Sequence, residues 1–265
     1  MDGRPLILVT NDDGLDSPGL AAAAEAVADL GELLLAAPAT QQTSMSRAFV
    51  TGPAVGAVQP REISVNGETV TGYAVTGTPV QAVAHALIEL AGRRPDLCVS
   101  GINYGENVGA DLTISGTIGA ALEAHAYGVP GVAVSLQADI SEWRTYGERD
   151  WAAAKHFTRR FARQVLAEGL PDDVALINVN VPHGATPRTQ VRRTRQSRRR
   201  YYVHVHPGPR TLADPVRLRI RTLVEPDLLE PDSDVRAVAC DGVVSVTPLT
   251  WSMTAATGWQ PAAGQ

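Results

Sequence analysis

Short, fully apolar runs alternate with helix-type stretches over residues 5–180, and this alternation limits the fold more than any other feature. A run without polar alternation is typical of a strand that is buried on both faces. Periodic apolar residues between the runs predict helices over 19–30, 79–91, 115–127 and 150–168. The pattern predicts an α/β fold, a Rossmann-like doubly wound, mostly parallel sheet. The predicted strands are Leu6–Val9, Leu33–Ala37, Asp96–Ser100, Val132–Leu136 and Val174–Val179.

Two further features organise the chain. Asn66-Gly67 lies between the strand-type segments Glu62–Val65 and Thr69–Val75, which predicts a β-hairpin. From about residue 187 the segments are short, strand-like and separated by prolines, which predicts a C-terminal antiparallel extension. We therefore expect a single domain over residues 1–265, with an α/β core (1–186), a β-rich extension (187–250) and a tail (251–265). The extension is too irregular to form its own core, so we expect it to bury surface against a partner subunit.

Composition excludes several classes of protein. The 265 residues and 44% hydrophobic content suit one globular domain with a full core, and the net charge of −5 favours neither nucleic acid nor membrane as a partner. No apolar run approaches the ~20 residues of a membrane span, and we expect no secretory signal. Cys98 and Cys240 are far apart, and no Cys/His spacing suggests zinc. A cytoplasmic enzyme that binds a metal through oxygen ligands fits this composition.

Two adjacent carboxylates follow the first predicted strand, in Asn11-Asp12-Asp13-Gly14, and Ser17-Pro18 then opens a helix. Open α/β sheets bind their ligands at this end of the strands. Neighbouring carboxylates resist ionising together, and a divalent cation with a preference for oxygen ligands relieves that repulsion. A solvated turn is the alternative interpretation of these four residues.

Three other polar segments are candidates for the same site. Ser100–Gly109 follows a predicted strand and carries three glycines and two asparagines, which suit a close backbone approach to a ligand. Ser115-Gly116-Thr117 opens a helix, where unpaired amides bind anions, although a plain N-cap explains it equally. Gln41–Ser46 offers hydroxyl groups after the second strand, or is simply a surface loop.

Together these motifs resemble the SurE-type survival proteins, the stationary-phase 5′-nucleotidases, over residues 5–250. The resemblance implies a Rossmann-like fold whose C-terminal extension joins protomers into homodimers or homotetramers. It also implies a metal-dependent phosphatase of nucleoside monophosphates, and some members of the family cleave polyphosphate. The matching segments are 11–14 with Pro18-Gly19, Gly77-Thr78-Pro79, 100–103, Gly105 with Asn107 and Gly109, 115–117, and 245–249.

The resemblance also implies the ligands of one Mg²⁺ or Mn²⁺ per subunit. Three of them fall on Asp12, Asp13 and Asn103. The fourth, a serine hydroxyl in the family, falls on Thr43 by spacing, and Ser44 is the alternative if the loop is shifted by one residue. The family has Ser-Gly where this chain has Thr43-Ser44.

The phosphate-contacting positions of the family fall on Asn107, Ser115, Gly116 and Thr117. Asp12 and Asp13 are the expected catalytic residues, with one of them assisting deprotonation of the attacking water. A route through an aspartyl-phosphate at Asp12 is the alternative.

One further tract has no place in this site. Seven arginines lie in residues 188–200 and Tyr201-Tyr202 follow, a composition that suits binding of single-stranded nucleic acid or a solvated arm facing another subunit.

The leading hypothesis for the function of the chain is hydrolysis of nucleoside 5′-monophosphates, with 3′-monophosphates left open. The alternatives are an exopolyphosphatase or short-RNA phosphatase, and a non-enzymatic nucleotide- or RNA-binding module.

Overall fold

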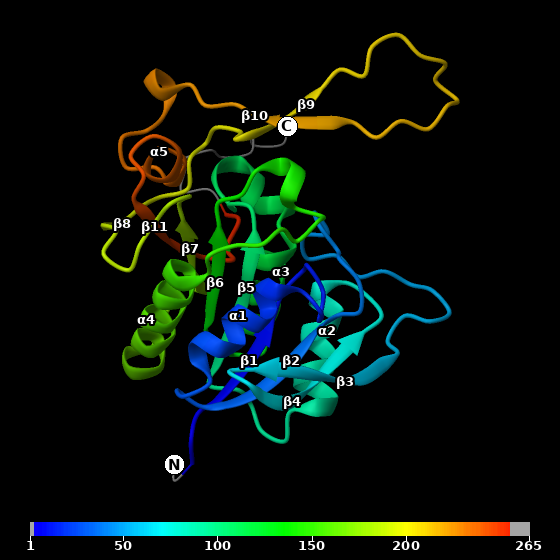
Figure 1. The fold of residues 1–265 in the computed structure, drawn as a ribbon, viewed down its shortest axis with the longest axis vertical. Coiled ribbons are helices and arrows are strands. Elements are labelled where there is room, and N and C mark those ends of the chain that lie inside the picture. Colours follow the sequence, from blue (N-terminus) through cyan, green and yellow to red (C-terminus); the bar gives the residue numbers. More distant parts are fainter. Residues whose placement is uncertain (1–2, 255–265) are drawn as a thin grey trace, which may run out of the picture.

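A nine-stranded sheet forms the centre of the molecule, which we describe over residues 3–254 of a computed structural model (Figure 1). The strand order is β3-β4-β2-β1-β5-β6-β7-β11-β8. Pairing is parallel from β4 through β2, β1, β5 and β6 to β7, so the predicted mostly parallel α/β sheet is confirmed. The bounds are β1 Leu6–Thr10, β2 Glu32–Pro38, β3 Val58–Val65, β4 Glu68–Val75, β5 Leu97–Tyr104, β6 Gly131–Leu136, β7 Leu176–Val181, β8 Val191–Arg193 and β11 Val244–Leu249.

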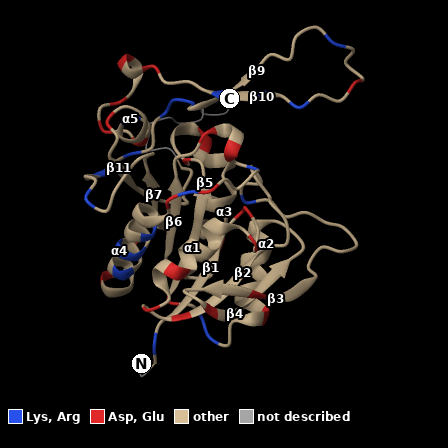
Figure 2. Cartoon of the chain, viewed as in Figure 1, with Lys and Arg blue, Asp and Glu red and all other residues tan. Residues whose placement is uncertain are grey.

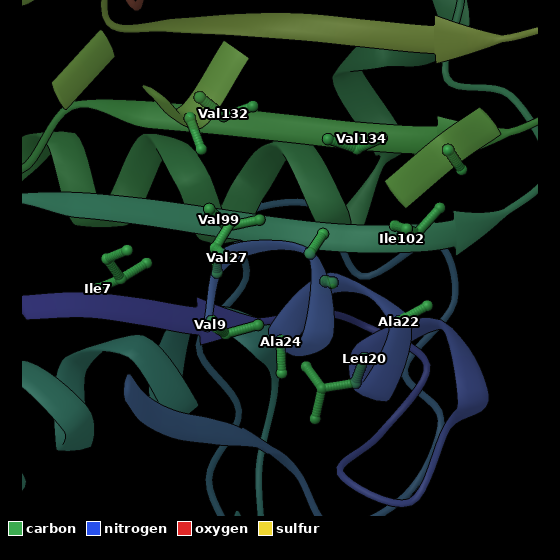
Figure 3. Packing of buried hydrophobic residues seen from close by; sticks show 14 of the residues in the cluster. Ile7, Val9, Leu20, Ala22, Ala24, Val27, Val99, Ile102, Val132 and Val134 are labelled. Carbon is green, nitrogen blue, oxygen red and sulfur yellow. The ribbon is translucent and has the colours of Figure 1, made fainter. Parts of the chain in front are cut away.

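Helices cover both faces of this sheet. α1 (Pro18–Val27) and α4 (Ala152–Glu168) pack on one face, and Figure 3 shows α1 side chains beside Ile7 and Val9 of β1. α2 (Pro79–His85) and α3 (Gly116–Ala126) pack on the other face against Leu8. Because successive side chains of β1 enter opposite apolar layers, its continuous apolar run follows from burial on both sides.

Some element boundaries differ from the sequence-based expectation. α1 ends at Val27 rather than residue 30, because Leu30 donates to Val27 in a tighter closing turn. α2 ends at His85, and a π-helix over Ala86–Leu90 completes the expected helix. β5 continues past Ser100 to Tyr104, which places Asn103 inside a strand.

The predicted hairpin is confirmed. Val65 of β3 pairs with Glu68 of β4, which leaves Asn66 and Gly67 as the two-residue turn. Their φ angles of 52° and 81° are both positive, as a type I′ turn requires.

The C-terminal region is only partly antiparallel. β11 pairs antiparallel with β7, as an antiparallel extension requires, whereas the three-residue strand β8 pairs parallel with β11. β9 (Tyr202–Val205) and β10 (Arg219–Thr222) form a separate hairpin that projects from the body (Figure 1). α5 (Asp234–Ala239) contributes to a small apolar cluster with Tyr201, Leu229 and Val108, so the extension does bury apolar side chains of its own.

The tail assigned to 251–265 lies mostly outside the described residues. In the part of the chain that the structure describes, no helix has the length and apolar character needed to cross a bilayer.

Candidate active site

The turn after β1 carries Asp12 and Asp13 to the carboxyl edge of the sheet, where both are almost fully buried (4% and 5% exposed). Asn11 shapes this turn, because its Nδ2 donates to Ser17 Oγ (2.8 Å) and its Oδ1 accepts from the Gly14 amide (3.0 Å). Ser17 in turn caps α1 by accepting from Leu20. The polar residues after the strand thus fix the backbone that aims the two carboxylates.

Only neutral donors reach these carboxylates. Thr117 Oγ1 donates to Asp12 Oδ1 (2.6 Å), and Gln41 Nε2 donates to Asp13 Oδ1 (2.9 Å). Within residues 3–254, no Lys, Arg or His forms an ion pair with either one. Burial raises the pKa of both groups, and the charge of Asp12 raises the pKa of Asp13 further. Two buried, adjacent carboxylates without a cationic partner among the described residues repel each other, and a bound cation would relieve that repulsion.

Asn103 lies on β5, next to β1 in the sheet, and lines the same cleft as the two aspartates. The β5–β6 pairing is irregular between Ser100 and Asn103. Asn103 Nδ2 donates to the Gly105 carbonyl (2.7 Å), which fixes the amide orientation. Its Oδ1 accepts no hydrogen bond from the described residues and is therefore the atom left for a ligand.

The loop after β2 brings Thr43 and Ser44 into the cleft, so both candidates for the hydroxyl ligand are close to the aspartates. The Gln42 amide donates to the Asp12 carbonyl (2.7 Å), and the Ser46 hydroxyl donates to the Thr113 carbonyl (2.7 Å). These bonds fix the loop on both sides of the two hydroxyl residues. Because both residues line the cleft, the choice between Thr43 and Ser44 stays open.

The start of α3 contacts Asp12 rather than opening wholly into the cleft. Ser115 lines the cleft and caps the helix, accepting from the Ile118 amide (3.2 Å). Thr117 is fully buried, and its hydroxyl is bound to Asp12. A Cβ on Gly116 would lie 2.7 Å from Asp12 Cβ. Three of the four residues expected to contact phosphate lie here: Ser115 borders the cleft, whereas Gly116 and Thr117 pack against Asp12.

Asn107 lines the cleft and is held by two asparagines of β7 that the sequence analysis missed. The backbone amide of Asn107 donates to Asn180 Oδ1 (2.8 Å), and its backbone carbonyl accepts from the side-chain Nδ2 atoms of Asn178 and Asn180 (2.8 and 2.9 Å). Both asparagines are fully buried. Two amide side chains alternating at the end of an otherwise apolar strand were the signal that could have found them.

The cleft encloses about 740 Å³, its open mouth included, and more residues border it than the motifs suggested. Gln41 and Trp143 line it, and Gln41 Nε2 donates to the Trp143 carbonyl (2.7 Å). Tyr146 is not part of the lining, but its hydroxyl donates to the Asp13 carbonyl (2.6 Å). The hairpin β9–β10 contributes Tyr202, together with His204 and Ile220. The sequence analysis placed Tyr146, Trp143, His204 and Ile220 in no motif. Gln41 belongs to the Gln41–Ser46 loop, and Tyr202 follows the arginine tract.

Comparison with known proteins shows the family to which this chain belongs. The family model described as Survival protein SurE matches residues 7–203. The chain belongs to the SurE family. A protein named 5′-nucleotidase SurE from Methanocella arvoryzae is 43% identical over 258 residues, covering 94% of this chain and 93% of its own length. Its counterpart in Thermococcus kodakarensis is 40% identical over 250 residues, with coverage of 94% and 93%.

A solved structure of the same family supports the fold. The SurE protein from Aquifex aeolicus superimposes with a TM-score of 0.72 at 29% identity, over 94% of this chain and 95% of that one. The likeness therefore extends through the C-terminal extension, beyond the part that the family model matches.

Proposed function

We propose that this member of the SurE family hydrolyses nucleoside 5′-monophosphates to nucleoside and phosphate. The observation that carries the proposal is the buried Asp12–Asp13 pair without a cationic partner among the described residues, at the carboxyl edge of the sheet. The relatives at 40% identity and above are named 5′-nucleotidase SurE, which supports the same reaction.

The donor set fits one Mg²⁺ or Mn²⁺ per subunit. Asp12, Asp13 and Asn103 Oδ1 would hold it, and the hydroxyl of Thr43 or Ser44 would complete the protein ligands. All of these are oxygen donors, which both ions prefer, and none is a thiolate or imidazole. The chemistry supplied by the bound cation is polarisation of the phosphoryl oxygens.

The surrounding residues hold the phosphoryl group. The Ser115 hydroxyl accepts from Ile118 and can donate its own hydrogen into the cleft. The N-terminus of α3 adds partial positive charge near the same place. Asn107, fixed by β7, lies at the cleft to contact a second phosphoryl oxygen. One of the two aspartates accepts the proton of the attacking water.

The test is hydrolysis of AMP by the purified chain, with and without EDTA. We expect EDTA to abolish activity and added Mn²⁺ or Mg²⁺ to restore it. Asp13→Asn should lower kcat/KM by ~100-fold or more, because it removes a charged ligand and a proton acceptor. An unchanged thermal midpoint in the variant would show that the fold survives. Near wild-type turnover of Asp13→Asn at saturating Mn²⁺ would refute the site.

The arginine tract supports a long polyanion as substrate less well than its seven arginines suggest. Arg192 pairs with Asp241 (2.5 Å) and Arg195 with Asp232 (2.7 Å), so these two charges are already balanced. Figure 2 shows acidic and basic residues intermixed over this end of the molecule. The polyphosphatase and RNA alternatives remain hypotheses, and activity on polyphosphate in the same assay tests them.

A further inference from the structure

The proposed phosphatase chemistry leaves one side of the cleft unused. Trp143, Tyr202, His204 and Ile220 border the same cavity as the aspartates. In the proposed reaction none of them holds the cation or the phosphoryl group. An apolar and aromatic side beside a phosphate site suits the rest of a phosphorylated substrate.

The hairpin presents one continuous face to the cleft. Tyr202 and His204 are two residues apart on β9, so their side chains point to the same face. The strand register places Ile220 of β10 opposite His204, which adds an aliphatic side chain to this face. An aromatic ring, an imidazole and a branched aliphatic group thus lie together above the carboxyl edge of the sheet.

Trp143 is held against this face and linked to the aspartates. Its ring lies 4.9 Å from that of Tyr202, centroid to centroid, in an edge-to-face contact at 89°. A Cβ on Gly105 would lie 2.5 Å from the indole Nε1, so only glycine admits the ring there. Gln41 Nε2 donates both to the Trp143 carbonyl and to Asp13.

Tyr202 is also fixed from its own side. Asp111 Oδ2 accepts from the amides of Tyr201 and Tyr202 (2.9 and 2.8 Å), which fastens the base of the hairpin to the rim of the cleft. The Tyr202 hydroxyl donates to the Glu106 carbonyl (3.3 Å). The ring face is therefore positioned while its polar atom points to the protein.

We propose that Trp143 and the hairpin face of Tyr202, His204 and Ile220 form a nucleobase subsite, an inference that rests on the proposed nucleotidase function. Because Trp143 and Tyr202 already contact each other, the base stacks on this wall and not between the two rings. Stacking on aromatic faces accepts every base. The subsite therefore selects for the presence of a base, with purines favoured by their larger area.

The test compares AMP with ribose 5-phosphate, which has the same phosphate and sugar but no base. We expect wild-type protein to prefer AMP, and Trp143→Leu to lower the AMP to ribose 5-phosphate ratio of kcat/KM by about tenfold. The link to Gln41 survives this change because it uses the backbone carbonyl. Tyr202→Leu should lower the ratio similarly, and Tyr202→Phe should preserve it. Tyr127→Leu, an exposed aromatic outside the cleft, is the matched control.

An unchanged ratio in both leucine variants would overturn the subsite, even if both substrates lost activity together. Calorimetric titration with adenosine separates this failure from failure of the proposed function, because adenosine binding needs no turnover. A dissociation constant at least fivefold weaker in Trp143→Leu supports the subsite even if neither phosphate ester is hydrolysed. Equal adenosine binding in both proteins, or none in the wild type, would overturn it.

Discussion

Gly116 has no side chain because Asp12 occupies the space where one would stand. An added Cβ would lie 2.7 Å from Asp12 Cβ and 2.8 Å from Oδ2, closer than real contacts permit. We predict that Gly116→Ala displaces the Asp12 carboxylate, lowering kcat/KM on AMP by ~100-fold at a stability cost of about 1–3 kcal/mol. Kinetics and thermal unfolding measure the two effects. Gly92→Ala is the control, since open space surrounds Gly92. Full activity in Gly116→Ala would mean that the Asp12 position is not critical.

Thr43 and Ser44 are the two candidates for the hydroxyl ligand, and single substitutions distinguish between them. Thr43→Val keeps the side-chain shape and removes the hydroxyl, so we predict a roughly tenfold weaker Mn²⁺ affinity by titration. The loss should stay below that of Asp13→Asn, because a neutral ligand contributes less and water can replace it. Ser44→Ala should be mild. The reverse ranking would assign the ligand to Ser44, and silence in both variants would remove the loop from the metal's ligand set.

At the scale of elements, α3 connects two parts of the site. Its first turn supports Asp12 through Thr117, and two turns later Glu123 accepts from Arg47 Nε (2.7 Å), directly after the Gln41–Ser46 loop. Glu123 is buried, whereas Arg47 is partly exposed. A buried carboxylate that loses its partner is destabilising, so this pair holds the ligand loop against the helix.

We predict that Arg47→Ala weakens Mn²⁺ binding several-fold and lowers the thermal midpoint, since Glu123 loses its partner and the loop its anchor. The double variant Arg47→Ala/Glu123→Gln should recover part of the stability, but not the metal affinity. Arg61→Ala, which breaks the exposed pair with Asp16 (2.5 Å), is the matched control. Unchanged metal affinity in Arg47→Ala would show that the loop is held without this pair.

The sequence predicted elements whose signals are local. Leu6–Val9, the Asn66-Gly67 turn and the Ser17-Pro18 helix start each depend on neighbouring residues, and each is confirmed. Asn178 and Trp143 were missed because their roles depend on partners 71 residues away at Asn107 and 102 residues away at Gln41. Local patterns therefore predicted strands and their polar ends, while the residues that position those ends appeared only in the fold.

For the whole molecule, we propose that the hairpin β9–β10 and its connecting loop pack on a second subunit. The loop projects from the body and exposes Leu212 (84%), Val216 (44%) and Leu218 (46%). We predict a dimer or tetramer by light scattering at micromolar concentration, and a smaller species for Leu212→Asp/Leu218→Asp, because buried charges oppose association. A wild-type monomer under these conditions would contradict the proposal.

The position of β1 in the sheet determines how much of the chain must be synthesised before both edges of this strand are paired. Of the strands in the described residues, β1 is synthesised first, yet it lies in the interior of the sheet between β2 and β5. Its register with β5 joins Ile7 to Leu97 and Thr10 to Ser100, so one edge of the nascent strand has no partner until about a hundred residues have emerged. Such non-local pairing slows folding and leaves an apolar edge open to other chains. Early nascent chains of this protein should therefore depend on chaperones more than their hydrophobic content alone would suggest.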